Sequence, residues 1–396
     1  MKNIVICFDG TWNTLDAPQM TNVVKAAQLV TPTNAQGCAQ VVHYDEGVGS
    51  GNVGVARRTD RALGGAFGVG LLVNVERAYR FLAFNYAQGD KIFILGFSRG
   101  AFSARALGGL IRKCGILSKH QVEALSKAIS LYKDKSKGPD SPEACQHRKD
   151  HSVPGYFNEV DQKWRLENRV PNAAAEPRLT IEYIGVWDTV EALGVPNYYA
   201  FAKRINDQFR FYDLRLSSAV QSARHALAID EHRRAFEATP WENIDELNER
   251  IGAGKLPVSE RPYQQQWFPG DHGSIGGGGL ENGISNQTLA WVIEGARRRG
   301  LGIDEAQLAG MKSSHRAPLL CMTKPSFDIM SLMLRASRPG PTAVKEDLSD
   351  ISEFARLRFA EPRENLPERR TYRPKTLKSV ANRLAELAAP RPPSGA

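Results

Sequence analysis

One stretch of sequence constrains the fold more than any other: an apolar run that ends at a serine between two glycines and continues into small residues. Residues 91–97 (KIFILGF) have the composition of a buried strand, and Gly96-Phe97-Ser98-Arg99-Gly100 fits the pattern G-x-S-x-G. Residues 100–114 (GAFSARALGGLIRKC) follow with a helical pattern that stops at Gly115. A serine on a strand-to-helix turn is typical of a nucleophile, so we predict that Ser98 is catalytic. An ordinary turn between a strand and a helix is the alternative.

Strand-like and helix-like segments alternate along the rest of the chain. Strand-like runs occupy 3–8, 91–97, 179–187 and 264–268. Helical patterns occupy 72–86, 100–114, 214–238 and 285–298. This alternation predicts a layered α/β fold, with a mostly parallel central sheet, helices on both faces, and helical or loop insertions. Together with the serine turn it favours the α/β-hydrolase arrangement.

The polar and basic stretches suggest a division of the 396-residue chain. We assign residues 1–340 to a catalytic domain and 341–396 to a basic C-terminal extension with a disordered tip (PRPPSGA). Within the domain, the polar stretch 135–178 lacks strand periodicity and is interpreted as an insertion. Residues 193–212 interleave aromatic and basic side chains, which suits a lid or lipid-facing lip. The core of a helical cap would have the same aromatic content.

A nucleophilic serine needs a base, and the base needs a carboxylate that orients it. In this fold they follow the serine in the order acid, then histidine. Asp188 follows the strand 179–187, although aspartates at strand ends are also common turn residues. His272 lies in a glycine-dense loop after the strand 264–268, and it is the one histidine of eight that combines this setting with the right chain order. We therefore predict Asp188 as the orienting acid and His272 as the general base.

The end of the first strand, Asp9-Gly10-Thr11, allows two interpretations. Phosphatases of the haloacid dehalogenase type open with a strand that ends in Asp-x-Asp-x-Thr, but Cys7 stands where their nucleophile would be. We instead assign the backbone amides of Gly10 and Thr11 to an oxyanion hole, together with the Arg99 N–H.

No cofactor or metal is expected. The string G-x-G-x-x-G at 49–54 lacks the strand-to-helix junction and the downstream acid of a dinucleotide site, so it is interpreted as a loop. The five cysteines have no paired spacing and are interpreted as reduced thiols. Because the chain has neither a signal-peptide core nor a run of roughly 18 apolar residues, we expect cytoplasmic synthesis without a membrane span.

The net charge of +9 is concentrated near the C-terminus, where residues 356–378 hold eight basic and three acidic side chains. The basic residues are Arg356, Arg358, Arg363, Arg369, Arg370, Arg373, Lys375 and Lys378. Such a stretch is either a peripheral contact for an anionic membrane or a solvated face. The chain has no zinc finger or RNA-binding aromatic motif, so no nucleic-acid partner is predicted.

Five strings occur in the order DGTWN, GVGSG, GFSRGAFSARALGGLI, GVWDTVEALG and WFPGDHGSIGGG. Together they resemble the catalytic domain of type VI secretion phospholipase effectors, an α/β-hydrolase family, over roughly residues 3–300. The resemblance implies Ser98 as nucleophile, Asp188 as acid and His272 as base. Many relatives carry an aspartate where this chain has Ser274.

The resemblance also implies a phospholipid or other acyl-ester substrate, a secretion apparatus or immunity protein as partner, and delivery to another cell. The expected activity is that of a serine esterase or lipase which works through an acyl-enzyme. The alternative is a catalytically idle hydrolase-like domain that serves as a binding or scaffold protein. The known effectors tend to carry an additional membrane-anchoring module, for which 396 residues leave little room.

Overall fold

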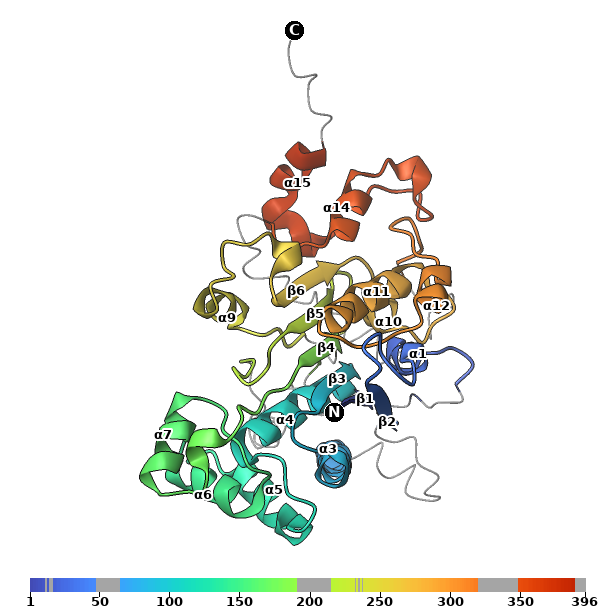
Figure 1. The fold of residues 1–396 in the computed structure, drawn as a ribbon. Helices are drawn as coiled ribbons and strands as arrows, with labels where there is room; N and C mark the ends of the chain where they lie inside the picture. Colours follow the sequence, from blue (N-terminus) through green and yellow to red (C-terminus); the bar gives the residue numbers. More distant parts are fainter. Residues whose placement is uncertain are drawn as a thin grey trace.

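The centre of the molecule is a six-stranded parallel sheet (Figure 1). The computed structural model describes residues 1–10, 13, 17–47, 65–190, 215–231, 233, 236, 238–319 and 348–388. The strands are β1 (Lys2–Phe8), β2 (Ala39–Asp45), β3 (Lys91–Phe97), β4 (Tyr183–Trp187), β5 (Ala223–Ala228) and β6 (Tyr263–Phe268). They lie in the order β2-β1-β3-β4-β5-β6, and each neighbouring pair is parallel. The predicted α/β fold is therefore confirmed.

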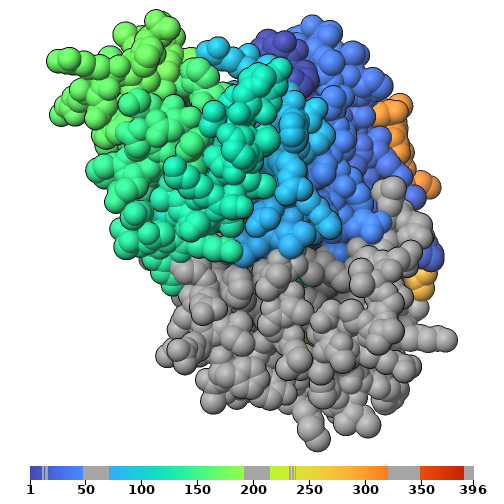
Figure 2. Space-filling view, turned by 90° about the horizontal axis from the view of Figure 1, so that it is seen from below, coloured from blue at the N-terminus to red at the C-terminus, as the bar shows by residue number. Residues whose placement is uncertain are grey.

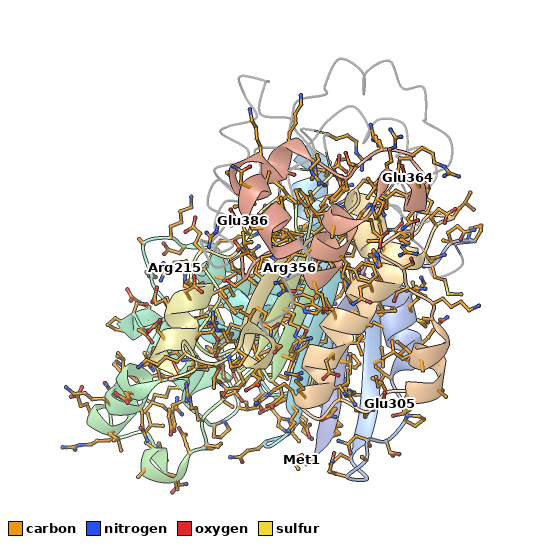
Figure 3. All side chains as sticks on the ribbon, turned by 90° about the horizontal axis from the view of Figure 1, so that it is seen from above. Met1, Arg215, Glu305, Arg356, Glu364 and Glu386 are labelled. Carbon is orange, nitrogen blue, oxygen red and sulfur yellow. The ribbon has the colours of Figure 1, made fainter. Side chains whose placement is uncertain are left out.

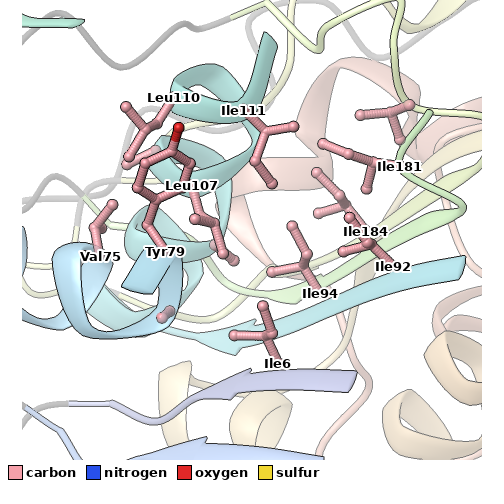
Figure 4. Close-up of a cluster of buried hydrophobic side chains, with 14 of the residues drawn as sticks. Ile6, Val75, Tyr79, Ile92, Ile94, Leu107, Leu110, Ile111, Ile181 and Ile184 are labelled. Atoms are coloured by element: carbon pink, nitrogen blue, oxygen red, sulfur yellow. The ribbon is translucent and has the colours of Figure 1, made fainter. Parts of the chain in front are cut away.

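Helices cover both faces of the sheet. They are α1 (Asn22–Leu29), α3 (Gly65–Asn85), α4 (Arg99–Cys114) and α11 (Gly283–Arg298). Ile6 and Ile94 point into the core under α3 and α4 (Figure 4), whereas their neighbours Val5 and Leu95 point into the core under α1 and α11. Burial on both faces explains why the strands are continuous apolar runs.

Three further helices lie between α4 and β4, in the part of the chain that includes the polar stretch 135–178. They are α5 (Leu125–Lys133), α6 (Pro142–His151) and α7 (Glu159–Glu167). Arg148 of α6 and Asp161 of α7 form a buried ion pair at 2.7 Å, and Arg148 also donates to the carbonyl of Lys113 at the end of α4. Figure 2 shows this part in green, beside the blue and cyan N-terminal third. The helices of this insertion are thus fixed to α4 by buried polar contacts.

The helix predicted over 214–238 is wrong, because residues Ala223–Ala228 in this range form the strand β5. Its sequence, ARHALA, consists largely of good helix formers, which explains the wrong prediction. All six residues are buried, and the strand pairs with β4 on one side and β6 on the other. Pairing within the sheet outweighs the local helical preference.

The described part of the C-terminal extension, residues 348–388, packs against the β6 edge of the sheet; we call it the C-terminal segment. It contains α14 (Glu353–Ala360) and α15 (Ala381–Ala388), at the top of Figure 1. The Trp267 N–H donates to the Asp350 carbonyl at 2.7 Å, and the Ser352 N–H donates to the Trp267 carbonyl at 3.0 Å. Apolar side chains of the segment share a core cluster with Leu227 and Trp267. The segment and the β6 side of the sheet thus share one buried apolar cluster, separate from the two clusters under the helices.

The remaining described helices are short. They are α9 (Ile244–Arg250), α10 (His272–Gly276) and α12 (Glu305–Gly310). The lid predicted over 193–212, the loop 49–54 and the tip after residue 388 lie outside the described residues.

Candidate active site

Ser98 lies in the turn between β3 and α4, at the carboxyl end of the sheet. Its backbone has φ 59° and ψ −124°, a conformation that a residue with a Cβ rarely adopts. It directly precedes the first residue of α4, yet its side chain does not cap the helix. The Ser98 hydroxyl is therefore not used as a cap of α4.

The two glycines of the turn are required by close packing of α4 against the strands. A Cβ at Gly96 would lie 2.5 Å from the carbonyl oxygen of Gly100, and a Cβ at Gly100 would overlap the carbonyl oxygens of Phe8 and Asp9. Real Cβ atoms do not approach backbone so closely, so side chains at these positions would push α4 away from β1 and β3.

Asp188, which follows β4, and His272, which lies four residues after β6, converge on Ser98 at the carboxyl end of the sheet. His272 Nε2 lies 2.8 Å from Ser98 Oγ, and His272 Nδ1 lies 2.6 Å from Asp188 Oδ2. Asp188 is fully buried, and its Oδ1 accepts the Ala228 N–H at 3.0 Å. When Nδ1 carries the proton that is donated to Asp188, the lone pair of Nε2 faces the serine hydroxyl. The structure thus brings together all three residues predicted from their chain order.

His272 is the first residue of α10 and does not lie in the glycine-dense loop expected from the sequence. Asp271 caps this helix by accepting the Ser274 N–H at 2.8 Å, which explains why a helix forms among glycines. The imidazole lies between the rings of Phe97 and Phe236, with both centroid separations 4.7 Å. These contacts fix the plane of the imidazole.

Two consecutive acids after β5 accept backbone N–H groups at and near His272, and neither acid was predicted from the sequence. Asp230 Oδ2 accepts the Gly270 N–H at 2.7 Å, and Glu231 Oε2 accepts the His272 N–H at 3.2 Å. Burial raises the pKa of Glu231, but hydrogen bonds and charge from Arg233 outweigh burial and hold that pKa below its usual value. A carboxylate pair directly after a buried strand would have been a usable signal had β5 been predicted.

Gly10 lies next to the serine: a Cβ built on it would be 3.3 Å from Ser98 Cβ. Its N–H donates to Asp9 Oδ1 at 2.6 Å, so in this structure the carboxylate occupies one of the amides assigned to the oxyanion hole. Asp9 is buried and also accepts the hydroxyls of Thr21 and Tyr44, each at 2.7 Å. Burial raises the pKa of Asp9 in spite of these hydrogen bonds. Asp9 therefore fixes the end of β1 beside the nucleophile.

Of the other two predicted oxyanion residues, Arg99 lies within the described part of the chain. Arg99 is the first residue of α4, so its N–H lies at a helix N-terminus, where the helix dipole favours negative charge. Burial lowers the pKa of its guanidinium to about 10. Thr11 lies outside the described residues.

Within the described residues, no group of three or more His, Cys, Asp or Glu side chains could hold a metal ion. The four cysteines of the described ranges, Cys7, Cys38, Cys114 and Cys145, are free. None of the helices in these ranges is long and apolar enough to cross a membrane.

The basic stretch 356–378 divides into one buried and several exposed side chains. Arg358 is fully buried; it donates to the carbonyls of His315 and Ala317 at 2.6 Å and pairs with Glu368 at 2.7 Å. The other seven basic residues are exposed. Arg356 and Glu364, both in this stretch, are labelled in Figure 3. Arg358 thus belongs to the core, whereas the others are available to solvent or a surface.

Comparison with known proteins agrees with the resemblance found in the sequence. The family model of the T6SS phospholipase effector Tle1-like catalytic domain matches residues 2–295. The uncharacterized protein YEL023C of Saccharomyces cerevisiae is 29% identical over 258 residues, which is 62% of this chain and 34% of that protein. This chain thus spans about a third of the length of that relative.

Two solved structures are also similar. One is the Tle1 effector bound to the VgrG spike from the type 6 secretion system, with a TM-score of 0.35 and 19% identity over 70% of this chain and 51% of that chain. The other is an uncharacterized protein from Pseudomonas aeruginosa, with a TM-score of 0.40 and 14% identity over 100% of this chain and 60% of that one.

Proposed function

We propose, because this chain belongs to the T6SS phospholipase effector Tle1-like catalytic domain family, that it is a serine hydrolase which cleaves acyl esters of phospholipids or related lipids. The observation that carries the proposal is the hydrogen-bonded series from Ser98 Oγ to His272 Nε2 and from His272 Nδ1 to Asp188 Oδ2, at 2.8 and 2.6 Å. Three residues in this relation are what acyl transfer to a serine requires.

In the proposed reaction Ser98 Oγ attacks the ester carbonyl while His272 Nε2 takes its proton. Asp188 keeps the imidazole in the tautomer that can accept this proton and stabilises the charge that forms. His272 then protonates the leaving alcohol, and the acyl group stays on Ser98. A water molecule, deprotonated by the same nitrogen, attacks the acyl-enzyme and regenerates the serine.

Negative charge that develops on the carbonyl oxygen needs donors close to the serine. The N-terminus of α4 supplies them, with the Arg99 N–H as the first candidate. The Gly10 amide would join them only if it left Asp9 Oδ1, to which it donates in this structure. The proposal therefore assigns the main stabilising role to α4.

The family supports the proposed class of substrate. A phospholipase effector domain acts on lipid esters, which makes phospholipid the first substrate to test and a type VI secretion apparatus the first partner. The exposed basic residues of the C-terminal segment would favour encounter with anionic lipid surfaces.

Ser98→Ala tests the proposal directly. We expect the folded variant to lose about three to six orders of magnitude in hydrolysis of a soluble chromogenic ester and of phospholipid vesicles, because the covalent route disappears. Ser103→Ala is the matched control, since this serine is buried further along α4 and its hydroxyl donates to the Arg99 carbonyl at 3.4 Å. Near-normal turnover by folded Ser98→Ala would refute the mechanism.

A catalytically idle domain that acts as a scaffold is the competing function. A fluorophosphonate probe separates the two, because only an activated serine reacts with it. The proposal requires labelling of the parent protein at Ser98 and no labelling of Ser98→Ala.

A further inference from the structure

The C-terminal segment lies beyond residue 295, where the match to the family ends, yet it reaches the histidine of the candidate site. Two series of hydrogen bonds, which we call the first and the second route, connect the segment to backbone groups within two residues of His272.

The first route runs through Tyr372. The hydroxyl of this buried tyrosine donates to Asp230 Oδ2 at 2.8 Å, and the same oxygen accepts the Gly270 N–H at 2.7 Å. The Asp230 N–H in turn donates to the Gly270 carbonyl at 3.0 Å. Asp230 thus holds both backbone groups of Gly270, two residues before His272, and Tyr372 is a second donor to the oxygen that does so. Gly270 has φ +106°, a conformation that glycine adopts readily and other residues rarely do.

The second route runs through Glu368. This carboxylate accepts the Leu319 N–H at 3.1 Å, and Arg358 of the same segment holds it by an ion pair at 2.7 Å. The Leu319 carbonyl accepts the Asp271 N–H at 3.2 Å and the Ser274 hydroxyl at 2.6 Å. Asp271 precedes His272 and caps α10, so this route fixes the helix on which the imidazole is carried.

We propose that the C-terminal segment positions the general base: Tyr372 acts through Asp230 to hold the Gly270 backbone, and Glu368 acts through Leu319 to hold the Asp271 N–H before His272 and the Ser274 hydroxyl after it. This inference rests on the proposed serine hydrolase function, because it assigns a role relative to His272 as base. Tyr372 and Glu368 are positioning residues, since their contacts reach His272 only through other groups.

The contribution is geometric. His272 must keep two hydrogen bonds at once, to Ser98 and to Asp188, and a small displacement of its backbone lengthens one of them. Displacements of about 1 Å in a reacting group can cost about 100-fold in rate. Loss of one remote hydrogen bond moves the backbone less, so a smaller effect on kcat is expected, with little effect on substrate binding.

Tyr372→Phe tests the first route, because it removes the hydroxyl and keeps the ring. Tyr79→Phe is the matched control: Tyr79 is equally buried, and its hydroxyl donates to the Gly115 carbonyl at 2.9 Å in another part of the core. We expect Tyr372→Phe to lower kcat on a soluble ester by about tenfold, with KM changed less than about twofold and fluorophosphonate labelling slowed equally. Tyr79→Phe should lower the melting temperature similarly while kcat stays at the parent value.

A double-mutant cycle tests whether Tyr372 works through Asp230. In an Asp230→Asn background, Tyr372→Phe should lower kcat by less than about twofold further, because the oxygen it supports has been altered already. Equal kcat for Tyr372→Phe and the parent, or a full additional tenfold loss in the Asp230→Asn background, would overturn the first route.

Glu368→Ala tests the second route, and it also tests the whole inference if Tyr372→Phe does not fold. It should also lower kcat at nearly constant KM, and a parent-like kcat would overturn the inference. A failure of the proposed serine hydrolase function would give a different result. The parent protein itself would then not react with the fluorophosphonate, and Ser98→Ala would match the parent in ester hydrolysis.

Discussion

Replacing Asp188 by asparagine tests the site sharply, because both carboxylate oxygens accept N–H groups. Oδ2 accepts from His272 Nδ1 at 2.6 Å and Oδ1 from the Ala228 N–H at 3.0 Å. An asparagine has one accepting oxygen, so its amide nitrogen must face one of these two donors.

If the nitrogen faces His272, it donates to Nδ1 and forces the proton onto Nε2, where the imidazole can no longer accept the proton of Ser98. A wrong tautomer of this kind lowers kcat by roughly 10⁴-fold in a serine protease, equivalent to about 5 kcal/mol of activation free energy. If the nitrogen faces Ala228 instead, a buried N–H loses its acceptor, at about 1–3 kcal/mol of folding stability. We expect the first orientation to dominate and kcat to fall by about 10³–10⁴-fold.

The assay is hydrolysis of a soluble chromogenic ester, with urea unfolding and circular dichroism to confirm that the variant folds. Asp90→Asn is the control: Asp90 is also buried and also accepts two backbone N–H groups, from Lys2 and Ala87, but it lies at the opposite end of the sheet. It should lose stability and keep its activity. A folded Asp188→Asn variant with kcat within tenfold of the parent would refute the assigned role of Asp188.

Three further predictions concern the turn, the acid behind the histidine and the charged surface. Gly96→Ala should unfold the protein at lower urea and abolish labelling by fluorophosphonate, because the added Cβ would lie 2.5 Å from the carbonyl oxygen of Gly100; parent-like labelling would contradict this. The pKa of Glu231 is lowered from its ordinary value of 4.5, so its ionised form stabilises the fold above that pH, and the stabilisation is lost as pH falls toward the lowered pKa. The difference in unfolding free energy between the parent and Glu231→Gln should therefore be constant above about pH 5.5 and shrink at more acidic pH, whereas a pH-independent difference would exclude this linkage. Replacing Arg370 and Lys375 by glutamine should weaken binding to vesicles rich in anionic lipid by about 30-fold at low salt and leave soluble-ester hydrolysis unchanged. Equal vesicle binding would mean that the basic stretch is only a solvated face.

The sequence predicted those parts of the molecule in which local pattern and tertiary structure agree. The run that ends at Ser98 is apolar, buried on both faces and followed by a helix, so each level of organisation points to the same turn. β5 was predicted wrongly because its alanines favour a helix locally, and only the neighbouring strands make it extended. That error also hid Asp230 and Glu231, whose position is visible only once β5 is known to end there.

The C-terminal segment illustrates a different limit. Its charges predict a surface, and most of them are exposed, but nothing in the local pattern distinguishes Arg358 from its exposed neighbours. Its burial depends on carbonyls more than 40 residues away in the chain, at His315 and Ala317. Long-range partners of this kind cannot be read from periodicity or composition.

The backbone contacts between Trp267 and residues 350–352 have a consequence for the behaviour of shortened chains. A last strand with unpaired N–H and C=O groups is a template onto which strands of other molecules can add. Asp350 and Ser352 occupy these groups at Trp267, and the apolar side chains of the same segment cover the cluster that contains Leu227. A chain that ends before Asp350 would uncover both, so truncated products are expected to self-associate through β6 and precipitate.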